Sequence, residues 1–309
     1  MEVIRGMHNL RERHRGCVAT IGNFDGVHLG HRALLRALAE KGREFGMPTL
    51  VITFEPQPRE YFQGREVPAR LTRMREKLSL LAELDVDRVL LLPFNERLAA
   101  LSAQDVIERL LVEGLGLRFL MVGDDFRFGH GREGDVAMLR AAGERFGFGL
   151  ADLDTLLVDG ERVSSTRVRA ALACGDLMLA ERLLGHPYFI MGRVVYGRRL
   201  GRELGTPTVN VPLKRYRAAL EGVFAVEVDG LGETLQGVAN IGVRPTVDGR
   251  EPLLEVHLFD FAGDAYGRLL TTRFRHKIRD EWKFDSLDAL RARIAVDVGE
   301  AKSFFGQTA

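Results

Sequence analysis

The apolar and polar positions of the chain follow two different periodicities, one in each half. In the first half, short runs of β-branched and other apolar residues alternate with segments whose apolar residues recur every three or four positions. The runs predict buried strands, and the segments predict amphipathic helices. We expect strands at 17–21, 49–54, 87–92, 118–123 and 149–153, and helices at 31–44, 71–84, 103–113 and 134–146. This alternation predicts an α/β domain with a Rossmann-like, doubly wound parallel sheet of about five strands, with residues 1–16 leading into the first.

The pattern changes after two further predicted helices, at 168–174 and 176–184. Because Pro187 cannot continue a helix, we place a boundary there and expect domains at 1–185 and 186–309. Six short runs broken by glycines then predict a six-stranded antiparallel β-barrel, with strands at 189–195, 208–211, 222–228, 235–241, 253–259 and 269–276. A C-terminal helix should begin after Ser286, a good N-cap, and pack on the barrel through Leu287, Leu290, Ile294 and Val298.

Composition narrows the partners to small molecules. The 309 residues carry a formal net charge of +1 without a basic tail, so neither nucleic acid nor an anionic membrane is an expected partner. No stretch approaches the ~18 apolar residues of a membrane span, and the first residues lack a secretion signal pattern. Cys17 and Cys174 have no metal-type spacing, and we expect both to be buried, reduced thiols in a cytoplasmic protein. No apolar stripe stands out as an interface rather than core, so the sequence leaves the oligomeric state open, with a monomer slightly favoured.

The segment from Gly22 to His31 carries the first candidate chemistry. It reads Gly-Asn-Phe-Asp-Gly-Val-His-Leu-Gly-His between a predicted strand and a predicted helix. If the helix begins near Leu29, then His28 and His31 share one face beside the free N–H groups and the positive end of the helix dipole. Gly30 lets the backbone approach a ligand's phosphates. The segment predicts an anion site whose imidazoles stabilise a phosphoryl transition state; the alternative is that both histidines are capping or surface residues.

Three further segments suit a ligand site in the first half. Pro56 and Pro58 fix an extended loop at the carboxyl edge of the sheet, where open α/β sheets bind ligands. Asp124 and Asp125 follow another strand, and they could bind ribose hydroxyls, a metal or only water. Residues 164–169, Ser-Ser-Thr-Arg-Val-Arg, place three hydroxyls and two guanidinium groups at a helix start. That arrangement suits a polyphosphate clamp, and also ordinary capping.

The predicted barrel offers a phosphate site and a base. Glycines recur at Gly192, Gly197, Gly201 and Gly205. Such a loop could hold phosphates on its N–H groups or form ordinary β-turns. Thr208 and Asn210 come next, two apart and therefore on one face of a strand, where they could complete a magnesium–phosphate site. Glu255 lies on the polar face of an alternating strand; it is either a harmless surface charge or a base for phosphoryl transfer to an alcohol.

These motifs resemble known families. His28-Leu29-Gly30-His31 after a strand is similar to the His-x-Gly-His signature of the nucleotidyltransferase superfamily, which joins a nucleoside monophosphate to an acceptor phosphate and releases pyrophosphate. Seven segments together, in order and over nearly the whole chain, resemble the bacterial bifunctional riboflavin kinase/FAD synthetases. They are 22–31, 54–58, 122–129, 164–169, 205–210, 239–246 and 254–261. The resemblance implies an N-terminal FMN adenylyltransferase and a C-terminal riboflavin kinase, with ATP as co-substrate and Mg²⁺ in both steps.

The resemblance also implies roles for individual residues. In the first half, ATP would bind at Asn23, Phe24, Asp25, His28, Gly30, His31, Ser164, Ser165, Thr166 and Arg167, and the flavin at Pro56, Pro58, Asp125 and Phe126. In the second half, Mg-ATP would bind at Thr208 and Asn210 of a Pro-Thr-x-Asn motif and at the four glycines, and the flavin at Asn240, Gly242, Arg244 and Glu255. Glu255 would take the proton of the terminal ribityl hydroxyl. The FMN formed would then attack the α-phosphorus of a second ATP, giving FAD and pyrophosphate.

Three positions depart from the commonest family pattern without removing a group that either reaction needs. Gln57 stands where many members have histidine, Val209 replaces a usual alanine, and Asp125 occupies a place held by Asn or Asp. Two other functions stay open at this point. One is a single adenylyltransferase whose barrel only binds flavin; the other is a non-catalytic flavin or nucleotide carrier, which would have no use for a base at the ribityl hydroxyl.

Overall fold

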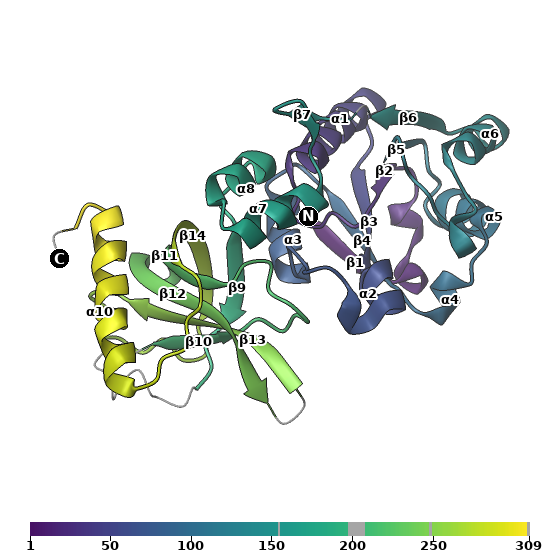
Figure 1. Cartoon of the computed structure of the whole chain (residues 1–309). Coiled ribbons are helices and arrows are strands. Elements are labelled where there is room, and N and C mark those ends of the chain that lie inside the picture. The colour runs from purple at the N-terminus through teal and green to yellow at the C-terminus, as the bar shows by residue number, and fades with distance from the viewer. Residues whose placement is uncertain (154, 197–207, 247–248, 308–309) are drawn as a thin grey trace. The chain divides into compact units, whose positions relative to one another are not determined.

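The structure is a computed structural model that describes residues 1–153, 155–196, 208–246 and 249–307. The chain forms two compact units (Figure 1). The first contains Met1–Val67 and Lys77–Ser164, and the second contains Pro68–Glu76 and Ser165–Ala309. A short segment of the first half of the sequence therefore packs with the second half. The division of activities at residue 185 stays a prediction.

The first unit is built on a six-stranded sheet whose neighbours are all parallel, in the order β1-β4-β3-β2-β5-β6. The strands are β1 (Glu2–Arg5), β2 (Val18–Ile21), β3 (Thr49–Glu55), β4 (Arg88–Pro93), β5 (Phe119–Gly123) and β6 (Gly149–Leu153). The doubly wound sheet is confirmed, and it has six strands where the sequence predicted about five. The sequence signal for β1 is weak because an edge strand with one neighbour buries only Ile4.

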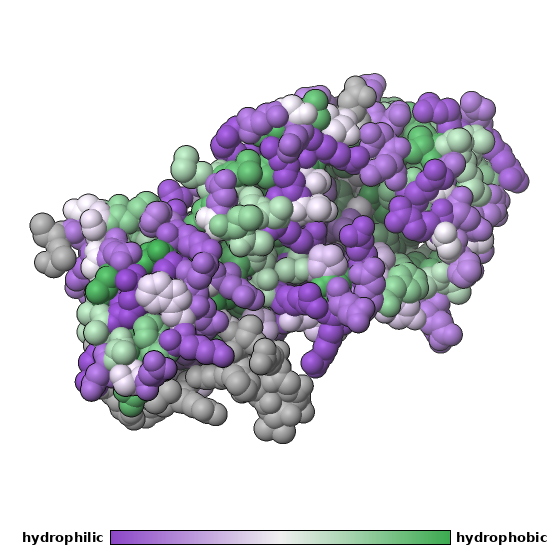
Figure 2. Space-filling model, viewed as in Figure 1, coloured by the Kyte–Doolittle hydropathy of each residue, from purple (hydrophilic) through white to green (hydrophobic). Residues whose placement is uncertain are grey.

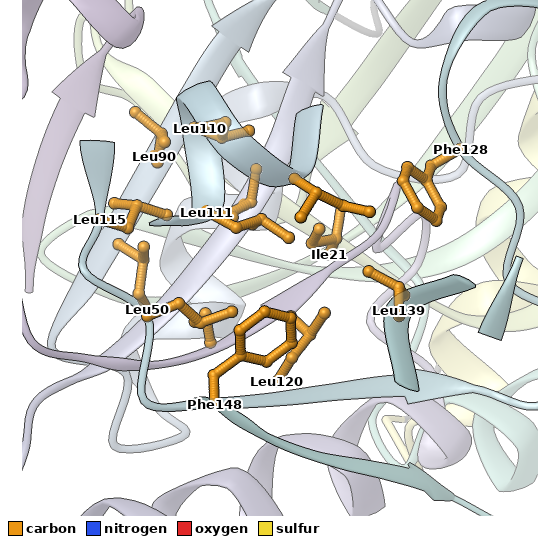
Figure 3. Packing of buried hydrophobic residues seen from close by; sticks show 14 of the residues in the cluster. Ile21, Leu50, Leu90, Leu110, Leu111, Leu115, Leu120, Phe128, Leu139 and Phe148 are labelled. Carbon is orange, nitrogen blue, oxygen red and sulfur yellow. The ribbon is translucent and has the colours of Figure 1, made fainter. Parts of the chain in front are cut away.

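Helices cover both faces of this sheet. On one face, α5 (Ala103–Asp105), η4 (Val106–Gly114) and α6 (Val136–Phe146) enclose a core that includes Ile21, Leu50 and Leu120, where the side chains converge in Figure 3. On the other face lies α1 (Leu29–Phe45), whose Gly42 approaches Val18 and Thr49. The predicted helix at 103–113 exists with Ser102 as its N-cap, although η4 is wound as a π-helix.

The shorter helices of this half correct two expectations. The helix predicted at 71–84 is α3 (Met74–Ala82), which starts late because the Glu76 carboxylate accepts a hydrogen bond from the Arg73 N–H at 2.6 Å. The loop after β3 is not extended throughout, since Pro58 opens α2 (Pro58–Gln63) at a position that suits proline. The remaining short elements are η1 (Met7–Asn9), η2 (Glu12–His14), η3 (Gly64–Glu66), α4 (Glu96–Ala99), η5 (His130–Arg132), β7 (Leu157–Val158) and β8 (Glu161–Arg162).

The second unit contains the expected six-stranded antiparallel barrel, in the order β10-β13-β12-β11-β14-β9. Its strands are β9 (Phe189–Arg193), β10 (Val209–Pro212), β11 (Gly222–Leu231), β12 (Glu233–Thr246), β13 (Gly249–Leu258) and β14 (Leu269–Arg279). The barrel nearly closes because Val195, just after β9, donates to the Asn210 carbonyl at 2.8 Å. Two helices precede it, α7 (Ser165–Cys174) and α8 (Leu177–Leu184), and the second ends at Gly185 in the left-handed conformation.

The C-terminal helix α10 (Leu287–Phe304) packs along the barrel as predicted (Figure 1), and Ser286 is its N-cap. One member of the predicted stripe was wrong: Leu287 is 66% exposed, because the packed face begins a turn later. The pattern missed two buried positions, Ala301 and Asp297, the second of which pairs with Arg279 and Arg293.

The thiols were expected to be buried. Cys17, in the first unit, is buried, but Cys174 is exposed at the end of α7.

Hydrophilic residues dominate the molecular face in Figure 2, with apolar residues scattered among them. Among the described residues, no helix combines the length and the apolar character that crossing a membrane requires.

Candidate active sites

The loop between β2 and α1 is held in an unusual backbone conformation. Phe24 and Val27 have φ angles of 47° and 43°, in a region that side chains rarely adopt, and Gly26 has a φ of 88°. Phe24, Asp25 and Val27 are nonetheless buried. A strained loop persists only where its surroundings fix it, and such loops gather at functional sites. The loop is therefore a rigid element that fixes the position of the first residues of α1.

His28 and His31 are brought together as the sequence predicted. His28 is the N-cap of α1, and its Nδ1 accepts a hydrogen bond from the His31 N–H at 3.4 Å. The two rings stack with their centroids 3.7 Å apart, and the Phe24 ring lies 5.0 Å from that of His31. Gly30 sits against the His28 ring, where an added Cβ would come within 3.3 Å of Cε1. The pair thus stands at the N-terminus of a 17-residue helix, where anions bind.

The electrostatics around His31 favour a neutral imidazole. Burial lowers the pKa of His31 well below its ordinary value, and the charges of His28 and Lys77 lower it further. Nδ1 of His31 is buried and has no hydrogen-bond partner in the described part of the chain. A neutral imidazole has one N–H group, and this group can donate a hydrogen bond to a phosphate oxygen. Lys77 was missed by the sequence reasoning, because a lysine in a predicted amphipathic helix is ordinarily solvated.

Aromatic side chains surround the two prolines. The Glu55–Pro56 peptide is cis, and Pro58 lies at the start of α2. Next to them, Tyr61 and Phe62 are 42% and 69% exposed, and each ring lies within 6 Å of the Phe94 ring. The sequence analysis did not single out these residues, although two adjacent aromatic residues follow closely after the prolines. They form an exposed apolar surface at the carboxyl edge of the sheet.

The end of β5 carries a charged cluster. Asp125 is solvent-exposed, and Arg162 lies 3.2 Å from its carboxylate and 3.5 Å from that of Asp124. Thr155 also donates to Asp124 at 3.1 Å. Phe126, just beyond, stacks on Phe128 with centroids 5.6 Å apart. Sequence reasoning overlooked Arg162, which stands two residues before Ser164. Because Arg162 lies beside both carboxylates, its positive charge offsets part of their negative charge.

The hydroxyl segment spans the two units. Ser164 is the last residue of one part of the first unit, directly after Val163, whose carbonyl lies near Gly30. Ser165, Thr166 and Arg167 open α7 in the second unit. The expected polyphosphate clamp opposite the histidines stays a prediction.

A row of polar residues crosses three neighbouring strands of the barrel. Glu255 on β13 is paired with Asn210 on β10 and with Asn240 on β12. Directly opposed residues of an antiparallel pair point to the same face, so the carboxylate lies between two amides. Glu255 is half-buried, and Asn210 is buried with no hydrogen-bond partner for its Oδ1 in the described part of the chain. Thr208 precedes β10 and is half-buried.

A second carboxylate stands beside this row. An added Cβ on Gly242 would collide with the Glu281 carboxylate, so the glycine makes room for it. Partial desolvation and the charge of Glu221 raise the pKa of Glu281, Arg279 opposes this, and Glu255 adds to it. Sequence reasoning missed Glu281, because nothing local separates it from the charged residues around it. No group of three or more His, Cys, Asp or Glu side chains that could hold a metal occurs in the described residues.

The remaining predicted residues of the barrel are Gly192, Arg244 and three further glycines. Gly192 is buried in β9, and a Cβ there would come within 2.2 Å of Val211, so close packing of strands already explains this glycine. Arg244 is paired along the backbone with Glu251 at the far end of β12. Gly197, Gly201 and Gly205 lie outside the described residues.

Comparisons with known proteins match the two halves of the chain to two different family models. A family model described as FAD synthetase matches residues 10–167, and one described as riboflavin kinase matches residues 184–305. The chain is therefore a two-part transferase, an α/β nucleotidyltransferase followed by a flavokinase barrel. It is 57% identical over 310 residues to the bifunctional riboflavin kinase/FMN adenylyltransferase of Escherichia coli K12, covering 100% of this chain and 99% of the relative. The enzyme of the same description from Pseudomonas fluorescens is 54% identical with the same coverage.

The chain belongs to the family of bifunctional riboflavin kinase/FMN adenylyltransferases, and its two activities are those of flavin cofactor biosynthesis, with riboflavin, FMN and ATP as substrates. Among solved structures, one described as a macrolide-efflux protein from Streptococcus pneumoniae is 28% identical with a TM-score of 0.82. That comparison covers 96% of this chain and 97% of the other. The likeness to this solved structure thus covers the residues of both units.

Proposed function

We propose that residues 1–185 transfer an adenylyl group to FMN, that residues 186–309 phosphorylate riboflavin, and that the FMN made by the second part is used by the first. The observation that carries the first assignment is the stacked pair of imidazoles at the N-terminus of α1. The carboxylate of Glu255 between two amides supports the second.

In the adenylyl transfer, an oxygen of the FMN phosphate attacks the α-phosphorus of ATP, and the bond from that phosphorus to the bridging oxygen of the β-phosphate breaks. Negative charge gathers on the transferring group and on the leaving pyrophosphate. His28 and His31 donate hydrogen bonds to these oxygens, and the first N–H groups of α1 add their partial charge. Ser164, Ser165, Thr166 and Arg167 hold the phosphates from the other side.

The rest of that site holds the substrates. Asn23, Phe24, Asp25 and Gly30 shape the loop that carries ATP. The flavin contacts Pro56, Pro58, Asp125 and Phe126. Tyr61 and Phe62 add an apolar platform for its ring system, since exposed aromatic rings at the edge of a site gain by covering a flat ligand.

In the kinase reaction, Glu255 accepts the proton of the terminal ribityl hydroxyl as its oxygen attacks the γ-phosphorus, and ADP leaves. Asn240, Gly242 and Arg244 bind the riboflavin, while Gly192, Gly197, Gly201 and Gly205 hold the ATP phosphates. Asn210 Oδ1 is a buried amide oxygen without a hydrogen-bond partner among the described residues, so it fits a ligand of Mg²⁺, and Thr208 adds a hydroxyl oxygen. When bound, Mg²⁺ neutralises phosphate charge.

Two variants test these assignments in one assay. With riboflavin and ATP, Glu255→Gln should form no FMN, yet it should still convert added FMN to FAD, because the amide keeps the shape but cannot take a proton. His28→Ala should accumulate FMN and form no FAD. If Glu255→Gln retains both activities, the base is wrongly assigned; if either variant loses both activities equally, the two sites are not independent.

The remaining expectations concern the setting. We propose a cytoplasmic monomer with no nucleic-acid partner, consistent with a net charge of +1. The single-activity alternative predicts FAD from FMN but no FMN from riboflavin, and the carrier predicts neither. Glu255 and the histidine pair together argue against the carrier, because binding alone requires no base.

A further inference from the structure

The side chain of Lys77 is fully buried. It stands in the first turns of α3, its exposed fraction is 0%, and its Nζ donates to the hydroxyl of Thr53 at 3.3 Å. Lysine is almost never fully buried, since removing an ammonium group from water is costly unless polar partners offset it. A fully buried lysine next to a candidate site is therefore a feature that its polar partners have to explain.

Lys77 ends a line of polar groups that runs beneath the loop before α1. Thr53 on β3 accepts from Lys77 and in turn donates to the backbone carbonyl of Asn23 at 3.4 Å. Thr20 on β2 is fully buried on the same face, because it is paired with Val51 and Thr53 lies two residues further along β3. Its hydroxyl has no hydrogen-bond partner in the described residues. Several buried polar groups close to strained backbone are typical of a functional site and not of a region that only stabilises the fold.

We propose that Lys77 is a positioning residue for adenylyl transfer: through Thr53 it holds the loop that carries Asn23. The inference rests on the proposed function of the His28–His31 pair. It adds a residue from a distant part of the sequence that touches neither substrate.

The charge acts on His31 in a definite direction. The titratable groups that lower the pKa of His31 are His28, in the same loop, and Lys77, from α3, and burial is the largest cause. A positive charge beside an imidazole disfavours the imidazolium. Lys77 therefore adds to the effects of burial and of His28, which favour the neutral form of His31. A neutral imidazole has one nitrogen able to donate to a phosphate oxygen and another able to accept.

A purely structural lysine would behave differently when it is replaced. Methionine is unbranched and of similar length to lysine. Lys77→Met takes the cation away from its buried partners at nearly unchanged volume, so it should cost some stability without changing the packing of α3. Its catalytic effect should be confined to the adenylyl transfer, because Thr53, Asn23 and His31 all belong to the first unit.

The experiment compares the full-length wild type, Lys77→Met and the control Lys41→Met. Lys41, on α1, is partly exposed and pairs with Glu44. Each protein is given FMN and ATP with magnesium, and riboflavin and ATP in a parallel reaction. For Lys77→Met we expect kcat for FAD formation to fall about tenfold or more. Its KM for ATP and its rate of FMN formation should stay within about twofold of the wild type, and Lys41→Met should match the wild type in both reactions.

A second readout separates positioning from packing. In NMR titrations of the imidazole signals, the apparent pKa of His31 should rise in Lys77→Met, because a repelling charge has been removed. An unchanged titration with unchanged FAD formation would overturn the proposal. So would equal loss of FMN and FAD formation in a folded Lys77→Met protein, since that indicates a structural role.

A pair of substitutions at Thr53 keeps the proposal falsifiable if Lys77→Met does not fold. Thr53→Val removes the hydroxyl at nearly constant volume, and Thr53→Ser restores it. We expect the valine variant to lose FAD formation selectively and the serine variant to recover it; equal activity in the two variants would refute the relay. If the wild type itself makes no FAD from FMN, the proposed function fails, whereas a fully active Lys77→Met protein refutes only the role of Lys77.

Discussion

Replacing Arg215 with methionine should destabilise the second unit strongly. Arg215 donates to both oxygens of the Glu76 carboxylate, at 2.6 and 2.5 Å, and each of these two side chains is only 1% exposed. It also donates to the hydroxyl of Tyr188 at 2.9 Å and to the carbonyls of Arg70 and Leu71. This network attaches the segment Pro68–Glu76 to the barrel unit.

The magnitude is set by the charge that the substitution leaves behind. In Arg215→Met, Glu76 keeps hydrogen bonds from the N–H groups of Met191 and Arg73, but its charge is buried without the guanidinium. Breaking a buried pair on one side costs about 3–5 kcal/mol. With a urea m-value of about 2–3 kcal/mol/M, the unfolding midpoint should fall by about 1–2 M. Adding Glu76→Gln removes the remaining buried charge while keeping an acceptor, so the double variant should be more stable than Arg215→Met alone.

The assay is urea unfolding monitored by the fluorescence of Trp282. It is the chain's single tryptophan and lies in the second unit, 5.1 Å from the Arg279 guanidinium. Its signal therefore reports the transition of the barrel unit, which a two-unit protein does not necessarily share with the first unit. A loss below about 1 kcal/mol in Arg215→Met, or a double variant less stable than the single one, would refute the reasoning.

Three other predictions concern single sites. A thiol reagent at neutral pH should label Cys174 rapidly and Cys17 only on unfolding. The reason is that Cys174 is exposed, whereas burial raises the pKa of Cys17 to about 12. Rapid labelling of both thiols would contradict the packing around β2. Glu281→Gln should raise the urea midpoint at pH 7 but not near pH 4. The raised pKa of this carboxyl means that the fold loses stability as pH rises through it, and a gain that is larger in acid would contradict this sign. Chelating magnesium with excess EDTA should stop both FMN and FAD formation, and turnover that persists without the ion would exclude the proposed role of Asn210 and Thr208.

Much of the fold could be predicted because it depends on local patterns. The buried run at β2, the glycine-rich turn and the leucines of α1 together specify strand, loop and helix, and this placed His28 and His31 side by side. Alternation along β13 likewise placed Glu255 on the polar face of the barrel. An edge strand such as β1, with a single buried residue, offers no comparable pattern.

The residues that the sequence did not reveal depend on distant partners. Glu76 and Arg215 are 139 residues apart, and each looks like an ordinary surface charge until the fold brings them together. The same holds for Lys77, whose neighbour Thr53 is in β3, and for Asp297 of α10. Charged residues usually lie at the surface, so a reading of periodicity passes over the few that are buried, and only their partners in space distinguish them.

The most direct test of the account is a time course of riboflavin with ATP, magnesium and the purified protein, in which riboflavin, FMN and FAD are separated by chromatography. We expect FMN to rise first and then to give way to FAD, because the product of the barrel is the substrate of the α/β unit. Riboflavin that stays unconverted while added FMN becomes FAD would contradict the kinase assignment, and no conversion of either flavin would contradict both.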